Sequence, residues 1–171
     1  MALPKKLKHM NLFNDGTSYV GQCKSVTLPT LARKLESFRG AGMDGPVKVD
    51  LGHSDDGIQI EWTLGGWDLT VLRQHGAVRA DGVMLRWAGS VQRDDTGETS
   101  AVEVVARGRH EEIDFGDAES GEDTEHSIIT TCSYYKLSID GNVEIEIDLL
   151  NFIFVVNGED RLAEHRAAIG L

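Results

Sequence analysis

The stretch SIITTCSYYKLSIDGNVEIEID, residues 127–148, decides the fold of this chain. Its first part, up to Ile139, is rich in β-branched and aromatic residues, which favour strands. Asp140 and Gly141 then supply the positive φ angles that a tight two-residue turn requires. Beyond the turn, apolar residues alternate with three acids on the opposite face: Glu144, Glu146 and Asp148. The stretch therefore predicts an antiparallel β-hairpin with one acidic face.

The same alternation of apolar and polar residues continues away from this hairpin. Residues 58–64 and 85–91 each place apolar or small side chains at every second position, as strands with one buried face do. The turn residues 94–99 join the second run to another β-rich run, residues 101–109. Near the start, Asn14, Asp15 and Gly16 separate two short runs in the same manner, which predicts a further hairpin.

Helix signals are few. Residues 67–75 offer about two turns that stop at Gly76, and Asn157 is placed to cap a second helix that runs to Gly170. No internal repeat and no Pro-rich or Ser-rich linker divides the chain. We therefore expect one domain over residues 1–171, mainly antiparallel β with two short helices.

Composition narrows the classes of protein. The 171 residues are 40% apolar and 26% charged, and no apolar run is long enough to cross a membrane. The first residues lack the apolar core of a secretory signal, so we expect synthesis in the cytoplasm. Cys23 and Cys132 are far apart in sequence and are expected to be free, buried thiols.

The charge is unevenly placed. Residues 1–48 hold eight Lys or Arg and three Asp or Glu, a net +5, whereas the other 123 residues hold nine bases and 25 acids, a net −16. So acidic a chain is a poor candidate for tight binding to nucleic acid. Either the split is a fluctuation without function, or the basic segment contacts the acidic body of another copy, head to tail.

Gly40, Gly42 and Gly45 match the G-x-G-x-x-G spacing of a dinucleotide-binding turn. That turn needs a buried apolar strand before it and a helix after it. Here the preceding residues, ARKLESF, are half charged, and the following residues, PVKVDLG, have an extended pattern. The glycines are therefore expected to belong to a flexible connection between two β segments, and no nucleotide or other cofactor is expected.

Three other patterns are interpreted as surface features. The Asp-Thr-Gly at residues 95–97 has the spelling of an aspartic protease motif, but its charged neighbours favour a solvated hairpin tip. His53 with its neighbouring acids, and His110 with Glu111 and Glu112, lack the spacing of metal ligands and are expected at the surface. The acidic run at residues 114–126 is expected to be a solvated loop. No catalytic, cofactor-binding or metal-binding residues are predicted.

Short segments spread over nearly the whole chain resemble a known family. They are KSVTLP (24–29), RKLE (33–36), RGAGM (39–43), VDLG (49–52), LGG (64–66), QRDDTGET (92–99), RGR (107–109), EID (112–114), GEDTE (121–125), EID (146–148), VNG (156–158) and IGL (169–171). In this order and at these distances, the chain resembles the major tail tube proteins of contractile-tailed bacteriophages, of the peduovirus type. The likeness is lowest at residues 67–82 and at Cys23.

The resemblance implies a structural virion protein and not an enzyme. Its subunits would form six-membered rings that stack into the hollow tail tube inside a contractile sheath, through which the genome is ejected. The implied fold is an antiparallel β-barrel or sandwich with a flanking α-helix, shared with R-type bacteriocin tubes and the Hcp tube of type VI secretion. Implied partners are further copies, the sheath, tape measure, baseplate and tail terminator proteins, and DNA that passes without specific binding. The subunit would assemble in the host cytoplasm without inserting into a membrane.

The resemblance also suggests site residues. The connection from Arg33 to Asp50 would reach adjacent rings, so the expected contacts between subunits are Arg33, Lys34, Glu36, Arg39, Met43 and Asp50. The candidate residues facing the lumen are Glu144, Glu146 and Asp148. Two alternatives stay open: the tube of a phage-tail-like bacteriocin or secretion injector that carries no genome, and a monomeric β-sandwich that binds carbohydrate or protein.

Overall fold

The computed structural model describes residues 1–171, which form twelve strands and two short helices. In chain order these are β1 (Lys6–Asn14), β2 (Thr17–Ser18), β3 (Cys23–Thr27), β4 (Arg33–Phe38), β5 (Val47–His53), β6 (Ile58–Leu64), α1 (Leu69–Gln74), β7 (Val83–Gln92), β8 (Thr99–Asp114), β9 (His126–Ile139), β10 (Asn142–Asp148), β11 (Ile153–Val156), β12 (Glu159–Asp160) and α2 (Ala163–Ala168). The expected antiparallel β fold with short helices is confirmed. No helix has the length and apolar character needed to cross a membrane.

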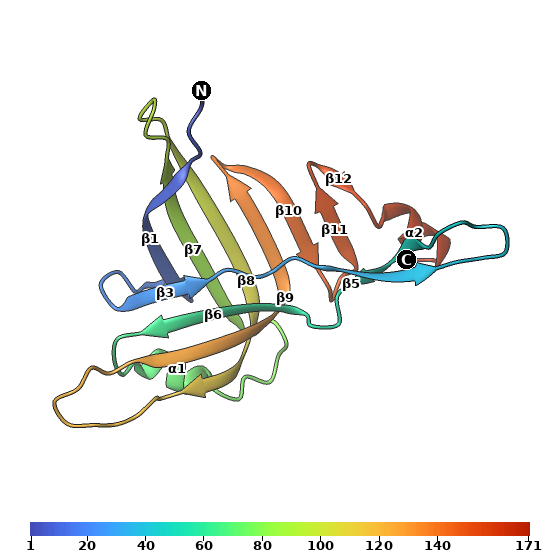
Figure 1. Ribbon diagram of the computed structural model, residues 1–171. Coiled ribbons are helices and arrows are strands. Elements are labelled where there is room, and N and C mark those ends of the chain that lie inside the picture. Colours follow the sequence, from blue (N-terminus) through green and yellow to red (C-terminus); the bar gives the residue numbers. More distant parts are fainter.

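Ten of the strands form one sheet that folds over on itself (Figure 1). Its main path runs β12-β11-β10-β9-β8-β7-β1-β2, and all pairs are antiparallel. Strand β9 belongs to two layers, because residues 126–132 pair with β6 and residues 134–139 pair with β10. The long neighbours β8 and β9 therefore carry the chain from one layer of a half-open barrel to the other.

Gly108 marks the place where β8 and β9 bend together. The register of the pair shifts between Arg107 and Gly108, and a Cβ at position 108 would lie 2.0 Å from the carbonyl oxygen of Thr131. Only glycine permits so close an approach of the two backbones. The bend of the sheet thus depends on one missing side chain.

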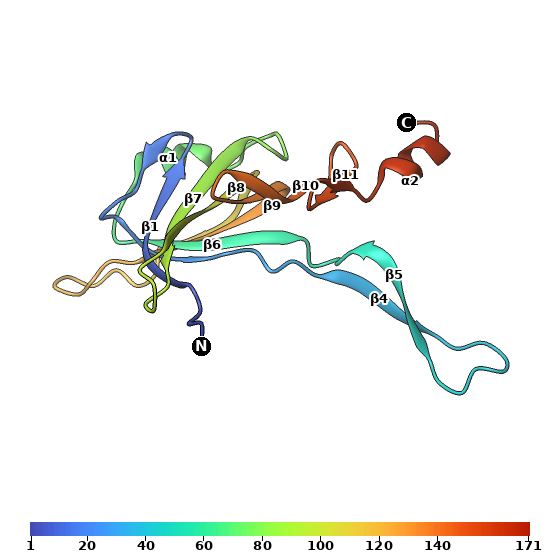
Figure 2. The same cartoon turned by 90° about the horizontal axis from the view of Figure 1, so that it is seen from above.

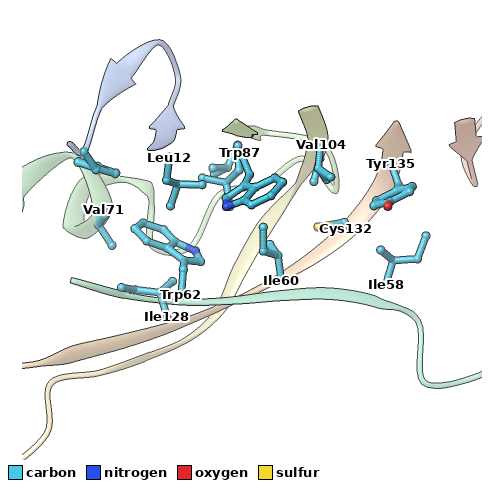
Figure 3. Close-up of a cluster of buried hydrophobic side chains, with 14 of the residues drawn as sticks. Leu12, Ile58, Ile60, Trp62, Val71, Trp87, Val104, Ile128, Cys132 and Tyr135 are labelled. Atoms are coloured by element: carbon cyan, nitrogen blue, oxygen red, sulfur yellow. The ribbon is translucent and has the colours of Figure 1, made fainter. Parts of the chain in front are cut away.

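The core lies between the two layers (Figure 3). Ile60 and Trp62 of β6 project from one layer toward Leu12 and Trp87 of the other, and each of these side chains is buried. This is the apolar face that the alternation at residues 58–64 predicted.

Helix α1 closes one side of the core through Val71. Asp68 caps the helix by accepting a hydrogen bond from the Val71 N–H at 3.0 Å, and Gly76 follows the helix with a φ of +78°. The predicted helix at residues 67–75 is confirmed. Gln74, the last residue of α1, is hydrogen-bonded to Asn14 and His110 in a buried polar network.

The expectation that His110 lies at the surface was wrong. Its side chain is buried, with Nε2 2.9 Å from Oε1 of Gln74 and Nδ1 2.9 Å from Oγ1 of Thr130. Burial lowers its pKa from 6.5 to about 4. Period 2 along β8 points His110 inward and Glu111 outward, and a shift of register between His110 and Glu112 leaves Glu112 exposed as well.

The predicted hairpins β1–β2, β7–β8 and β9–β10 are all present, but the C-terminal prediction was partly wrong. Asn157 does not cap a helix. It has a φ of +51° in the turn between β11 and β12, and α2 begins only at Ala163. Cys132 is a buried free thiol as expected, whereas Cys23 is only half-buried.

Strands β4 and β5 form a separate two-stranded sheet that projects from the body (Figure 2). The loop between β8 and β9 lies at the opposite end of the molecule in both views (Figures 1 and 2). We call the segment from Arg33 to His53 the arm.

Candidate functional site

The arm exposes a row of apolar side chains on one face. In the register of β4 and β5, Phe38 pairs with Val47 and Glu36 pairs with Val49, so these residues share a face, and Leu51 continues it along β5. The apolar stripe is Phe38, Val47, Val49 and Leu51, with exposed fractions of 59%, 55%, 44% and 57%. An isolated two-stranded hairpin is marginally stable at best in water. The stripe is therefore an exposed apolar surface that no other part of the chain covers.

The base of the arm is anchored to the body through Phe154 of β11. The Arg33 guanidinium carbon lies 5.0 Å from the centre of the Phe154 ring, and the His53 ring meets the same ring edge-on at 4.9 Å. Arg33 Nε also donates to Oδ2 of Asp50 at 2.9 Å, and this bond holds the pKa of the Asp50 carboxyl below its usual value. Burial, together with the nearby Arg33 charge, lowers the pKa of His53. These contacts hold the base of the arm against the body.

The tip of the arm holds the three glycines of the G-x-G-x-x-G match. Gly42 has a φ of +84°, the left-handed region that favours glycine, whereas Gly40 and Gly45 have ordinary negative angles. Arg39 folds over the tip and donates to the carbonyl oxygens of Met43 and Asp44 at 3.3 and 3.0 Å. No helix follows the glycines. They shape a hairpin loop and leave no helix N-terminus to receive a phosphate.

The six predicted contact residues all lie on the arm, yet their charges are largely balanced within the chain. Arg33 pairs with Asp50, and Lys34 Nζ lies 2.6 Å from Oδ2 of Asp55. Met43 is half-buried at the tip, and Glu36 is exposed beside the apolar stripe. The structure therefore gathers the predicted residues on one element. Glu36 and Arg39 form no ion pair within the chain, and the apolar stripe adds exposed apolar area to the same element.

Glu146 and Asp148 lie on the free face of the sheet, opposite the buried Ile147. Glu144 is next to them along β10, at a bulge in its pairing with β9. Cations accompany these acids on the same face, because Glu146 pairs with Lys136 across the strands and Asp148 pairs with Tyr134, which is next to Arg107. The face therefore carries acidic and basic side chains next to each other. The sequence had predicted only its acids.

The arginines of this face are held by neighbours. Arg86 Nε donates to Oε2 of Glu103 at 2.9 Å, and its guanidinium carbon lies 4.8 Å from the centre of the Phe13 ring. Arg107 lies over the Tyr134 ring at 5.2 Å. Only Arg86 has an acidic partner, whereas Arg107 keeps its charge over the Tyr134 ring and Lys136 forms no ion pair, so the face combines acids with free cations.

The other sequence patterns concern metal ligands and the Asp-Thr-Gly turn. No group of three or more His, Cys, Asp or Glu side chains is placed to hold a metal ion. Asp95 accepts two bonds from Arg93 at an exposed hairpin tip, as expected for a solvated turn.

Sequence reasoning missed the apolar stripe and the anchor Phe154. The signal for the stripe was present, since Val47, Val49 and Leu51 alternate with polar residues. Phe154 carried no such signal, because its contact with Arg33 depends on two segments that are distant in sequence.

Comparison with known proteins gives consistent matches. The model of the family described as phage tail tube protein FII matches residues 4–170. The chain is 56% identical to the tail tube protein of Escherichia phage P2, over all of both chains. It is 41% identical to the major tail tube protein of Serratia phage KSP20, over 94% of this chain and 92% of the relative.

Among solved structures, the chain is similar to one in the cryo-EM structure of the anti-feeding prophage baseplate, 6-fold symmetrised. The TM-score is 0.55 with 8% sequence identity, and the match covers 81% of this chain and 97% of the other. At so low an identity the likeness concerns the fold alone.

Proposed function

Because this chain belongs to the phage tail tube protein FII family, we propose that its subunits form hexameric rings that stack into the hollow tail tube inside a contractile sheath. Tail tube proteins are structural components of the virion. The assembled tube conducts the genome into the host, and it is built in the host cytoplasm from soluble subunits. Its other partners are the sheath, tape measure, baseplate and tail terminator proteins.

One observation carries this proposal: the arm is an incomplete structure in the single subunit. Four exposed apolar side chains line one face of a two-stranded hairpin that has no packing partner of its own. Burying that stripe against another copy removes apolar surface from water, the main favourable term in most protein association. Because the arm projects away from the body, such a contact extends from one subunit to the next (Figure 2).

Two further observations support the ring and the conduit. A similar fold occurs in the 6-fold symmetrised structure of the anti-feeding prophage baseplate, so a ring of six is compatible with this fold. The acids Glu144, Glu146 and Asp148 on β10 repel a polyanion, which suits the wall of a channel through which DNA slides without adhering.

A tube that carries no genome, as in a bacteriocin or secretion injector, has the same architecture. The two relatives found among curated proteins are both from phages, which favours the conduit. DNA extracted from purified particles that contain this subunit separates the two functions.

The test is assembly of purified subunits, followed by sedimentation and negative-stain microscopy. We expect the wild-type protein to form rings or tubes as its concentration rises. The double variant Phe38→Ser, Val49→Ser should stay folded but monomeric, because it removes the centre of the apolar stripe. Leu35→Ser is the matched control, since it removes a similarly exposed apolar side chain from the other face of the arm. Wild-type protein that remains monomeric at high concentration contradicts the proposal, as does normal assembly of the double variant.

A further inference from the structure

Three aromatic rings form a cluster at the end of the molecule opposite the arm. Trp67 stacks on Phe115 at 5.2 Å between ring centres, and His126 meets both rings edge-on at 4.7 and 5.1 Å. Trp67 is 70% exposed and Phe115 is 40% exposed, whereas His126 is 5% exposed and lies beneath them. We call these three residues the aromatic platform.

The surrounding backbone holds the platform in place. Phe115 directly follows the end of β8 and His126 begins β9, so the two residues close the base of one loop. Trp67 comes from a different segment, between β6 and α1, where Asp68 fixes the start of the helix. A preorganised, exposed Trp stacked on a second ring is costly to leave in water, and it is the kind of anchor that dominates protein interfaces.

The loop above the platform is strongly acidic. Residues 114–126 contain six carboxylates and no Lys or Arg. Lys24 contacts Asp123 and lies 3.3 Å from Oε2 of Glu125, and it is the one cation paired with the loop. An apolar surface beside unpaired carboxylates fits a partner that combines apolar and basic side chains.

The arm has that combination. Its stripe is apolar, and its tip carries Arg39, which forms no ion pair within the chain. Lys48 also lacks an ion pair, but it lies on the opposite face of β5. The arm and the platform lie at opposite ends of the molecule in both views, so the arm of one copy does not reach its own platform (Figures 1 and 2). A contact between them therefore joins two copies head to tail, the arrangement that builds open stacks.

We propose that the aromatic platform is the receptor for the apolar stripe of a second copy of this chain. The acidic loop steers the approach by attracting Arg39 at the tip of the arm, and Trp67 with Phe115 contacts the stripe. This inference rests on the proposed assembly into a tube, and it identifies the surface at which one subunit receives the next.

The direct test is disulfide cross-linking between two differently sized copies. One copy carries Val47→Cys and the other, lengthened by a tag, carries Trp67→Cys, both in a Cys23→Ser background that removes the half-buried native thiol. After mild oxidation of the mixed assembly we expect a mixed dimer, which is absent from dilute, unassembled subunits. The matched control moves the second cysteine to Val143, an exposed apolar position on the β9–β10 hairpin, and should give at least tenfold less mixed dimer.

A second measurement uses the concentration needed for assembly. Trp67→Ala should raise this concentration at least tenfold while the circular dichroism of the subunit is unchanged. Trp67→Phe should assemble at close to the wild-type concentration, because it keeps a ring on the platform. Leu69→Ala, an exposed apolar residue nearby, is the control and should assemble like the wild type.

The outcomes separate the two proposals. Tubes that form normally but give no mixed dimer overturn the receptor and leave the tube intact, as does Trp67→Ala protein that assembles at the wild-type concentration. A cross-link from position 67 to a different virion protein also overturns it, because the platform would then receive another partner. Failure of the wild-type protein to assemble at all overturns the proposed function itself.

Discussion

Gly108 and His110, two residues apart on β8, show how single positions support the fold by different means. Gly108 allows two strands to approach because it lacks a side chain. His110 ties the helix to the sheet because it is neutral: its Nε2–H donates to the amide oxygen of Gln74, which leaves Nδ1 to accept from the hydroxyl of Thr130. Both roles lead to predictions at the scale of one residue.

Gly108→Ala should destabilise the subunit severely. The added methyl group would lie 2.0 Å from a backbone oxygen, which no side-chain rotation relieves, so we expect a loss of roughly 3 kcal/mol or more in the free energy of unfolding. Urea denaturation measures it. Gly45→Ala is the control, because a Cβ there meets nothing within 4 Å and its φ is ordinary. Equal stability of the two variants would show that the bend does not depend on position 108.

His110 should make the subunit less stable in mild acid. Its pKa is about 4 when folded and about 6.5 when unfolded, so between these values the unfolded chain binds more protons. The stability is fully present above pH 6.5 and falls as the pH drops toward 4, by roughly 3 kcal/mol in total. His53, whose pKa is also lowered, acts in the same direction.

The matched variant for this prediction is His110→Gln, which keeps hydrogen-bonding atoms but does not titrate. Urea denaturation of both proteins at pH 7, 6, 5 and 4.5 should give a shallower loss of stability in the variant. Identical pH profiles would mean that His110 is not the group responsible.

At the scale of elements, prediction from sequence succeeded where a pattern is local. The hairpins β1–β2, β7–β8 and β9–β10 each combine alternating residues with a turn, and helix α1 has its stop at Gly76. The C-terminal segment failed, because Glu159 and Asp160 pair with β11 and form β12 in place of a first helical turn. The partner lies only a few residues away, across a tight turn at Asn157 and Gly158, so a local hairpin signal overrode a local helix signal.

The candidate site was predicted from the sequence only in part. The arm was expected as a connection between β segments, and its boundaries were close to the observed ones. Its anchor on Phe154 and the platform that joins Trp67 to Phe115 both depend on segments far apart in the chain. Such contacts follow from the folded topology and leave no trace in local spacing.

Of all the strands in the subunit, those of the arm should show the largest change in hydrogen exchange on assembly. In the free subunit its two strands pair only with each other, so we expect rapid hydrogen exchange at the amides of β4 and β5, compared with slow exchange in β8 and β9. In assembled material the arm amides should become protected. Exchange followed by mass spectrometry measures both states, and an arm that is already protected in dilute subunits would contradict its need for a partner.

In the whole molecule, the exposed surfaces of different character lie at different ends or faces. The arm extends from one end, and the aromatic platform and acidic loop lie at the other (Figures 1 and 2). The free face of the sheet carries acidic and basic side chains next to each other. The strong net charge of −11 keeps separate subunits soluble, while the unfilled apolar surfaces favour contact at defined places.

The most direct test of the central claim is a cryo-EM reconstruction of the assembled subunits. We predict that each apolar stripe, from Phe38 to Leu51, lies buried against a neighbouring copy, with Trp67 of that neighbour in contact. An assembly in which the arm stays exposed to solvent, or folds back over its own body, would contradict the claim that this subunit is completed by its neighbours.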